Sequence, residues 1–189
     1  MAAVAWANQT FTPAEASAFT EAPVQRVRKE LEHEIIEAST SPPRLTFAAL
    51  VYLRALHMME LDWPVSERAA MYRLVVSAVR SASATVRLAR LLTLEVKPVV
   101  DELEDRMTRF QRWKDRLVTS PDIMGGEPVF PRRRLTVRRV GEMLERGESP
   151  GVVREDYPYL TAEDLEFARL FVRAYPRVGR PPANRQAAR

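Results

Sequence analysis

The spacing of apolar residues near the N-terminus predicts two short helices within residues 11–33. The first begins with Thr12 as N-cap and Pro13 in its first turn, and Glu15 completes a capping box with Thr12. The second can begin at Pro23, and its apolar residues fall on one face: Val24, Val27 and Leu31. The polar residues of this second helix therefore point outward.

The segment that follows these helices predicts a β-wing. An apolar pair, Ile35–Ile36, precedes the turn-rich run Ser39-Thr40-Ser41-Pro42-Pro43, and the chain returns at Arg44–Leu45. Helix, turn, helix and wing is the order of elements in a winged helix-turn-helix. We therefore expect residues 1–90 to form an N-terminal winged-helix domain that binds DNA.

The central residues predict buried helices, a short strand and a connector helix. Residues 46–59 are apolar almost all round, which indicates a buried helix, and a second helix is expected from about Ser66 to Arg80. Apolar and polar residues then alternate in a short strand that Pro98 ends, over residues 92–97. Apolar residues recur with a heptad-like spacing from there to Leu117, and this seam can either dimerise or pack within its own domain. We expect residues 91–117 to form the strand and connector helix.

The C-terminal third predicts three helices. The first covers about residues 137–146 and is closed by Gly147, and the second begins at Ser149 with Pro150 behind it. The third begins at Thr161, where Asp164 offers a second capping box. The expected fold class is mainly α: an N-terminal winged helix-turn-helix, a helical connector with a short strand, and a helix-turn-helix-like bundle of three helices over residues 118–176.

The positive charge of the chain is concentrated in two places. The net charge is +4, and five arginines but no acid lie from Arg173 onward, so the rest of the chain is close to neutral. Residues 177–189 are therefore expected to be a disordered basic tail. A second cluster contains Arg132, Arg133, Arg134, Arg138 and Arg139. Such clusters favour a polyanion or an acidic protein groove as partner, with a merely solubilising tail as the alternative.

The sequence offers little for catalysis. It has no cysteine and two histidines, His33 and His57, and neither sits in a recognisable cluster of reactive groups. We therefore expect a protein that is not an enzyme and uses no metal or cofactor. No apolar run reaches the roughly 18 residues of a membrane span, and the first residues lack the features of a signal peptide. The expected location is cytoplasmic.

Two separated motifs point to a family. The first reads SPDIMGGEPVF over residues 120–130 and continues as RLTV at 134–137, and the second reads LERGESP over 144–150 and DYPYLTAED over 156–164. These motifs resemble the bacterial family called domain of unknown function number 433, over roughly residues 118–175. Its members are commonly antitoxins encoded beside PIN-like ribonuclease toxins, which is what the resemblance implies here. The opening FTPAEA at residues 11–16 is similar to the winged helix of MerR-type regulators.

The first motif departs from the family pattern at one point. Where the family has Gly-Thr-Arg, this chain reads Arg132-Arg133-Arg134. The flexible turn that a glycine supplies is therefore in doubt. The added charge also makes this loop a better contact for a polyanion.

The expected DNA contacts lie on the second helix and on the basic loop. Gln25 and Arg26 suit base edges, and Arg28 and Lys29 suit phosphates or base edges. The loop can add backbone contacts from Arg132, Arg133, Arg134 and Arg138. The alternative is a solvated helix face, because Glu30 and Glu32 dilute the charge. The last helix begins with acids that repel phosphate, so the C-terminal bundle is expected to make protein contacts instead: Glu163, Asp164 and Glu166.

The tail suggests how a toxin can be masked. PIN-type nucleases gather carboxylates around metal ions, so Arg180, Arg185 and Arg189 can act as a cationic plug. The run Gly179-Arg180-Pro181 also resembles an AT-hook, although Val178 stands where a preceding arginine is expected.

The sequence therefore predicts an antitoxin that neutralises a PIN-like toxin. As a homodimer it would also bind operator DNA and repress its own transcription. The first alternative is a stand-alone MerR-like transcriptional regulator without a toxin, which senses a small molecule near residues 47–59. The second is a structural adaptor that binds no nucleic acid.

Overall fold

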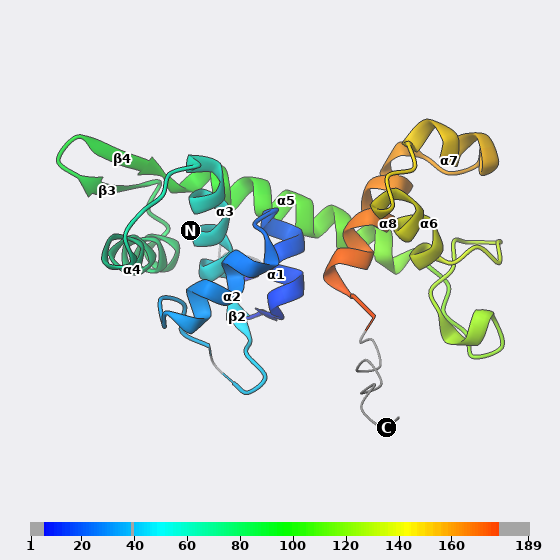
Figure 1. Cartoon of the computed structure of the whole chain (residues 1–189), viewed down its shortest axis with the longest axis horizontal. Coiled ribbons are helices and arrows are strands. Elements are labelled where there is room, and N and C mark those ends of the chain that lie inside the picture. The colour runs from blue at the N-terminus through cyan, green and yellow to red at the C-terminus, as the bar shows by residue number, and fades with distance from the viewer. Residues whose placement is uncertain (1–5, 39, 178–189) are drawn as a thin grey trace, which may run out of the picture.

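The computed structural model describes residues 6–38 and 40–177 and is mainly helical, as expected (Figure 1). Its helices are α1 (Pro13–Thr20), α2 (Val24–Glu32), α3 (Phe47–Met59), α4 (Val65–Ser81), α5 (Val96–Asp115), α6 (Val137–Glu145), α7 (Pro150–Asp156) and α8 (Ala162–Ala174). Its strands are β1 (Thr10–Phe11), β2 (Leu45–Thr46), β3 (Thr85–Ala89) and β4 (Leu92–Glu95). None of the described helices has the length and apolarity needed to cross a bilayer.

Helix α5 runs through the middle of the molecule and organises the rest (Figure 1). Helices α1, α3 and α4 pack against it, and α8 packs against both α5 and α1. Its buried side chains recur along one face: Val96, Val99, Leu103, Met107, Phe110 and Trp113. This face is the heptad-like seam of the sequence, and it is filled by neighbouring helices of the same chain. Any dimer therefore has to use another surface.

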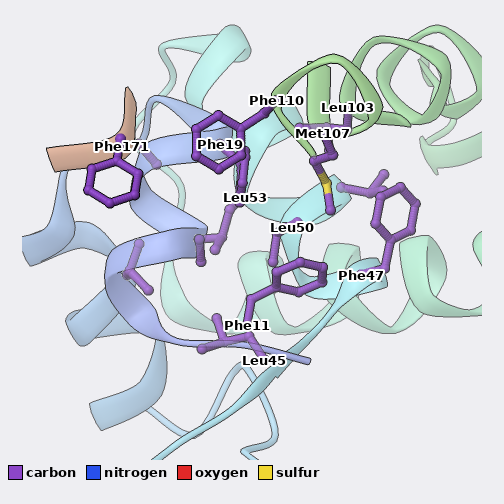
Figure 2. Packing of buried hydrophobic residues seen from close by; sticks show 14 of the residues in the cluster. Phe11, Phe19, Leu45, Phe47, Leu50, Leu53, Leu103, Met107, Phe110 and Phe171 are labelled. Carbon is purple, nitrogen blue, oxygen red and sulfur yellow. The ribbon is translucent and has the colours of Figure 1, made fainter. Parts of the chain in front are cut away.

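A row of aromatic rings joins the N-terminal helices to the C-terminal ones. The Phe19 ring on α1 lies 5.5 Å from the Phe110 ring on α5, and Phe110 lies 5.8 Å from Phe167 on α8. Trp113 stacks on Phe110 at 5.8 Å. Figure 2 shows Phe19 between Phe110 and Phe171 of α8. Because edge-to-face pairs add to the burial of large apolar area, this row fixes α1, α5 and α8 together.

The capping signals of the sequence are confirmed. The Thr12 hydroxyl accepts the backbone N–H of Glu15, and the Glu15 carboxylate accepts the N–H of Thr12 at 2.8 Å. Thr161 and Asp164 form the same reciprocal pair at the start of α8. Ser149 caps α7. These residues set where the helices begin because each satisfies backbone donors that the helix itself leaves open.

The expected pairing of the wing is wrong. Strand β2 pairs antiparallel with β1, so Thr46 lies opposite Thr10, and the expected hairpin with Ile35–Ile36 does not form. The N–H groups of Ile35 and Ile36 both donate to the Glu30 carbonyl, at 3.0 and 3.2 Å. They close the end of α2 and have no donor left for a strand. The full winged-helix arrangement stays a prediction.

Strands β3 and β4 form a hairpin that projects from the end of the molecule beside α4 (Figure 1). The alternating pattern predicted β4 correctly but not β3. The expected boundary between residues 90 and 91 falls at the tip of this hairpin. The strand also ends before Pro98, because Val96 begins α5 and a proline is tolerated in the first turn of a helix.

The three C-terminal helices lie within two residues of their expected bounds, and α6 packs closely on α8 at Gly141. A Cβ at Gly141 would lie 2.6 Å from Val172 Cγ1 and closer still to the Ala168 carbonyl oxygen. No side chain fits between the two helices at this point, so glycine is required by the close approach and not by its φ.

We predict that Gly141→Ala destabilises the protein by about 1–3 kcal/mol, because it forces α6 away from α8. Urea unfolding followed by circular dichroism measures the change. Gly151→Ala on α7 is the matched control, since its Cβ would meet only Ser149 Oγ at 3.7 Å. The control should be neutral or slightly stabilising, as alanine favours a helix. Equal stability of the two variants would contradict the close contact.

Candidate nucleic-acid interface

Helix α2 presents one polar face to solvent. Gln25, Arg28, Lys29 and Glu32 are exposed and are spaced so that they share a side of the helix. Val27 is fully buried on the opposite side, where α2 packs against α1. Three of the four residues expected to contact DNA on this helix are therefore available to a partner.

Glu30 is buried and holds α2 in place. Its side chain is fully buried and accepts the Tyr52 hydroxyl of α3 at 2.8 Å. Arg68 of α4 places its Nε 3.0 Å from the other carboxylate oxygen, and its guanidinium also donates to the Trp63 carbonyl at 2.5 Å. Burial raises the pKa of Tyr52, and the nearby Glu30 carboxylate raises it further. The interpretation that Glu30 dilutes the outer charge of α2 is wrong, because this carboxylate faces the core.

Arg26 lies at the edge of the exposed face. Its side chain is 38% exposed, and its guanidinium lies 3.8 Å from Glu30. It is therefore directed partly toward the buried carboxylate. This position is less suited to a base contact than those of Gln25 and Arg28.

The basic loop between α5 and α6 exposes its three expected contacts, whereas the fourth expected contact, Arg138, lies on α6. Arg132, Arg133 and Arg134 are exposed, and the Arg133 guanidinium stacks 4.4 Å from the centre of the Tyr159 ring. Arg138 differs, since its side chain is 12% exposed and pairs with Glu127 at 3.2 Å. Arg138 also donates to the Tyr175 carbonyl at 3.0 Å and so ties the loop to the end of α8.

The turn that a glycine would supply is retained without one. Arg132 has φ +61°, which is the left-handed conformation that glycine adopts most easily. The turn therefore forms although Arg132 stands where the family has glycine. The loop keeps its turn and gains an exposed cation.

The two sets of expected DNA contacts lie apart. In Figure 1, α2 lies among the N-terminal helices, whereas the loop before α6 lies at the opposite end of α5. The structure does not combine them into one patch. The expected toxin contacts Arg180, Arg185 and Arg189 lie outside the described residues.

Many other cations are neutralised within the chain. Arg54 contacts Glu21 at 2.6 Å and Glu102 at 2.7 Å. Burial works against the charge of Glu21, but Arg54 and Arg106 outweigh it and hold the pKa of this carboxyl below its usual value. These pairs connect α1, α3 and α5 and leave little positive charge there for a partner.

The acidic start of α8 is also occupied. Arg116, which follows α5 as its C-cap, lies 3.2 Å from Glu163, and the Trp113 indole N–H donates to Asp164 at 2.9 Å. Arg109 lies 3.6 Å from Glu166. Helix α8 also packs on α6 and α1. This helix therefore serves the internal packing of the chain.

The sequence interpretation missed a third group of cations. Arg73 and Arg80 on α4, and Arg87 and Arg90 on the hairpin, are exposed and make no ion pair or side-chain hydrogen bond with any described residue. One sequence signal could have found them. Between Glu67 and Glu95 there is no acidic residue, although five arginines lie in that stretch.

The C-terminal part of the chain is similar to a known family. Residues 117–172 match the model of a family described as a protein of unknown function, DUF433. This segment contains the basic loop and helices α6 and α7 with most of α8, and the match confirms the resemblance there. The N-terminal likeness to MerR-type regulators and the pairing with a PIN-like toxin stay predictions.

One relative covers part of the chain. A stretch of 89 residues is 30% identical to a protein of Sinorhizobium fredii (strain NBRC 101917 / NGR234) named Uncharacterized protein y4eO. The match spans 47% of this chain and 40% of that protein. No solved structure matches the chain.

We predict that Glu30→Ala destabilises the protein by about 3–5 kcal/mol, because it leaves the buried Arg68 guanidinium without a counter-charge. Chemical unfolding measures the loss of stability. Glu32→Ala on the same helix is the matched control, since Glu32 is exposed and its removal should change stability by less than about 0.5 kcal/mol. A small effect at both positions would show that Glu30 does not anchor α2.

Proposed function

We propose that this protein is an antitoxin that binds operator DNA through α2 and neutralises a PIN-like ribonuclease toxin. The observation that carries the DNA-binding part is the polar face of α2. There Gln25, Arg28 and Lys29 are exposed with one acid, Glu32, while Glu30 is turned into the core. This gives the helix a net positive outer face together with a side chain, Gln25, that can read adenine.

The dimensions of α2 suit the major groove. A helix of nine residues is about 14 Å long, and one such helix fits into the groove with its exposed face toward the base edges. Arg28 and Lys29 then reach bases or phosphates on one side of the helix. A homodimer would place two copies of α2 in half-sites about one helical turn of DNA apart.

The toxin-binding part rests on the family resemblance and on the charge of the tail. The matched segment 117–172 belongs to the part of the chain for which the resemblance implies an antitoxin. Arg180, Arg185 and Arg189 supply cations without a neighbouring acid in the sequence. Arginines can form bidentate pairs with the carboxylates of a nuclease centre.

The end of α8 brings the tail close to α2. Pro176 and Arg173 line the same hollow as Arg28 and Pro23, and the hollow has a volume of about 650 Å³. The tail therefore starts beside the face that we propose for DNA. This proximity gives toxin binding a direct route to influence operator binding, which is what autoregulation requires.

The first test neutralises the exposed cations of α2. The variant R28Q/K29Q should bind the DNA upstream of its own gene more weakly, and the slope of log affinity against log salt should fall by about 0.9 for each phosphate that the protein no longer neutralises. Fluorescence anisotropy across a salt series measures both quantities. The matched control is K97Q/R146Q, which changes the net charge equally at two cations that already pair with Asp101 and Glu148.

The control should bind DNA as the wild type does. If the two double variants have the same affinity and slope, α2 is not the DNA-binding helix. If wild-type protein shows no salt-dependent binding to duplex DNA, the DNA-binding part of the proposal fails.

The second test removes the tail. A variant that ends at Pro176 retains every described helix and strand, so it should fold normally. We expect it to lose neutralisation of the toxin while it still binds DNA, because the cationic plug is gone. Growth on co-expression with the neighbouring gene, followed by pull-down of its product, measures the effect.

Full neutralisation by the shortened variant would refute the plug and place toxin binding on the folded part of the chain. If the full-length protein does not bind the neighbouring gene product either, the antitoxin assignment fails. DNA binding without any toxin partner would then support a stand-alone regulator.

A further inference from the structure

Helix α4 and the β3–β4 hairpin carry a separate set of positive charges that pair with none of the described residues. Arg73, Arg80, Arg87 and Arg90 are exposed, and no acidic residue lies between Glu67 and Glu95. The chain has 25 acidic residues, and acids pair with most arginines of α5 and α8. The lack of acids is therefore a feature of this stretch and not of the whole sequence. The fifth arginine of the stretch, Arg68, is the one that pairs with buried Glu30.

The register of the hairpin directs its charge outward. Val86 lies opposite Leu94, and both are partly buried where the hairpin packs toward α4. Arg87 lies opposite Thr93, and both are exposed on the other face. Because successive side chains of a strand alternate between faces, the apolar pair anchors the hairpin and leaves Arg87 to solvent.

The tip of the hairpin exposes a large apolar side chain. Leu91 is 96% exposed, which makes it the most exposed large apolar residue in the described chain, and it follows Arg90 directly. Leu92 is also 37% exposed. Leu91 contributes nothing to the core from this position. The hairpin projects beyond the helices, so its tip can reach a partner without rearrangement of the body (Figure 1).

We propose that this hairpin is a second DNA contact, separate from α2, in which Arg87 and Arg90 hold the backbone and Leu91 packs into the minor groove. Proteins that read DNA with β-ribbons place strands in the major or the minor groove. Arginines beside an exposed leucine are the combination that minor-groove proteins use, since the cations follow the negative potential and the apolar side chain wedges against base steps. Arg73 and Arg80 of α4 extend the positive surface at the base of the hairpin.

An acidic protein surface is the competing partner, but it fits the tip less well. It would pair with the arginines while leaving Leu91 exposed, unless it also offered an apolar pocket at the same place. A DNA groove supplies both the phosphates and the apolar surface of sugars and bases. The inference rests on the proposed DNA-binding function, because it adds a second contact to the same complex.

Two variants of the full chain separate the ionic part of this contact from the apolar part. R87Q/R90Q should lower the salt slope of binding by close to two units, about 0.9 for each phosphate that is no longer neutralised. L91S should weaken binding about tenfold and leave the slope unchanged, because it removes apolar surface from the interface and no charge. The probes are a duplex of the upstream DNA and a scrambled duplex of equal length, measured by anisotropy.

The control is again K97Q/R146Q, and the thermal midpoints of all variants should match the wild type because the replaced side chains are exposed. The inference is overturned if R87Q/R90Q and L91S bind both duplexes as the control does while R28Q/K29Q does not. It is also overturned if R87Q/R90Q keeps DNA binding but no longer binds the neighbouring gene product, since the hairpin then faces an acidic protein. If wild-type protein binds neither duplex, the proposed DNA-binding function itself fails.

Discussion

Both the N-terminal and the C-terminal helices pack on the apolar face of α5, and this constraint determines which surfaces remain available to partners. The Phe110 ring contacts Phe19 of α1 on one side and Phe167 of α8 on the other. N-terminal and C-terminal helices therefore share one buried cluster, and neither group can turn freely about α5. The surfaces that remain exposed outside this cluster include the outer side of α2, the solvent-facing side of the hairpin beside α4, and the arginines of the loop before α6. All the proposed contacts within the described residues lie there.

Within that framework, ion pairing decides which cations a partner can use. The net charge of +4 says little about this, because it sums 29 basic and 25 acidic residues without regard to place. Exposed pairs such as Arg169 with Glu145, at 2.7 Å, add little stability, but they cancel the field of the arginine at the surface. The positive regions of the molecule are then defined by the exposed cations that have no described acidic partner, such as those of α2 and the hairpin. A DNA interface proposed from composition alone would have placed charge on α5 and α8 as readily as on α2.

Local signals in the sequence predicted most of the helices, whereas contacts between residues far apart in the chain could not be predicted from it. Thr12, Ser149 and Thr161 mark helix starts because a cap acts on donors within one turn of the chain. The partner of β2 and the burial of Glu30 depend on residues far along the chain, as Thr10 and Arg68 are. The same holds for the site. The exposed residue types on α2 could be predicted from periodicity, and the lack of nearby acids at Arg87 and Arg90 could be read from the sequence. That no distant acid among the described residues pairs with them could only be seen in the structure.

The basic loop retains its turn with Arg132 in a position that glycine adopts most easily. The Phe130 N–H donates to the Leu135 carbonyl and the Arg133 N–H donates to the Phe130 carbonyl, both at 3.1 Å. These two bonds enclose Arg132, which adopts the left-handed conformation in this turn. A residue other than glycine adopts that conformation at a cost of roughly 1 kcal/mol, which the surrounding bonds and the buried Phe130 and Leu135 can offset. The hydrogen bonds and the buried neighbours therefore hold the turn without a glycine, and Arg132 adds a charge to the loop.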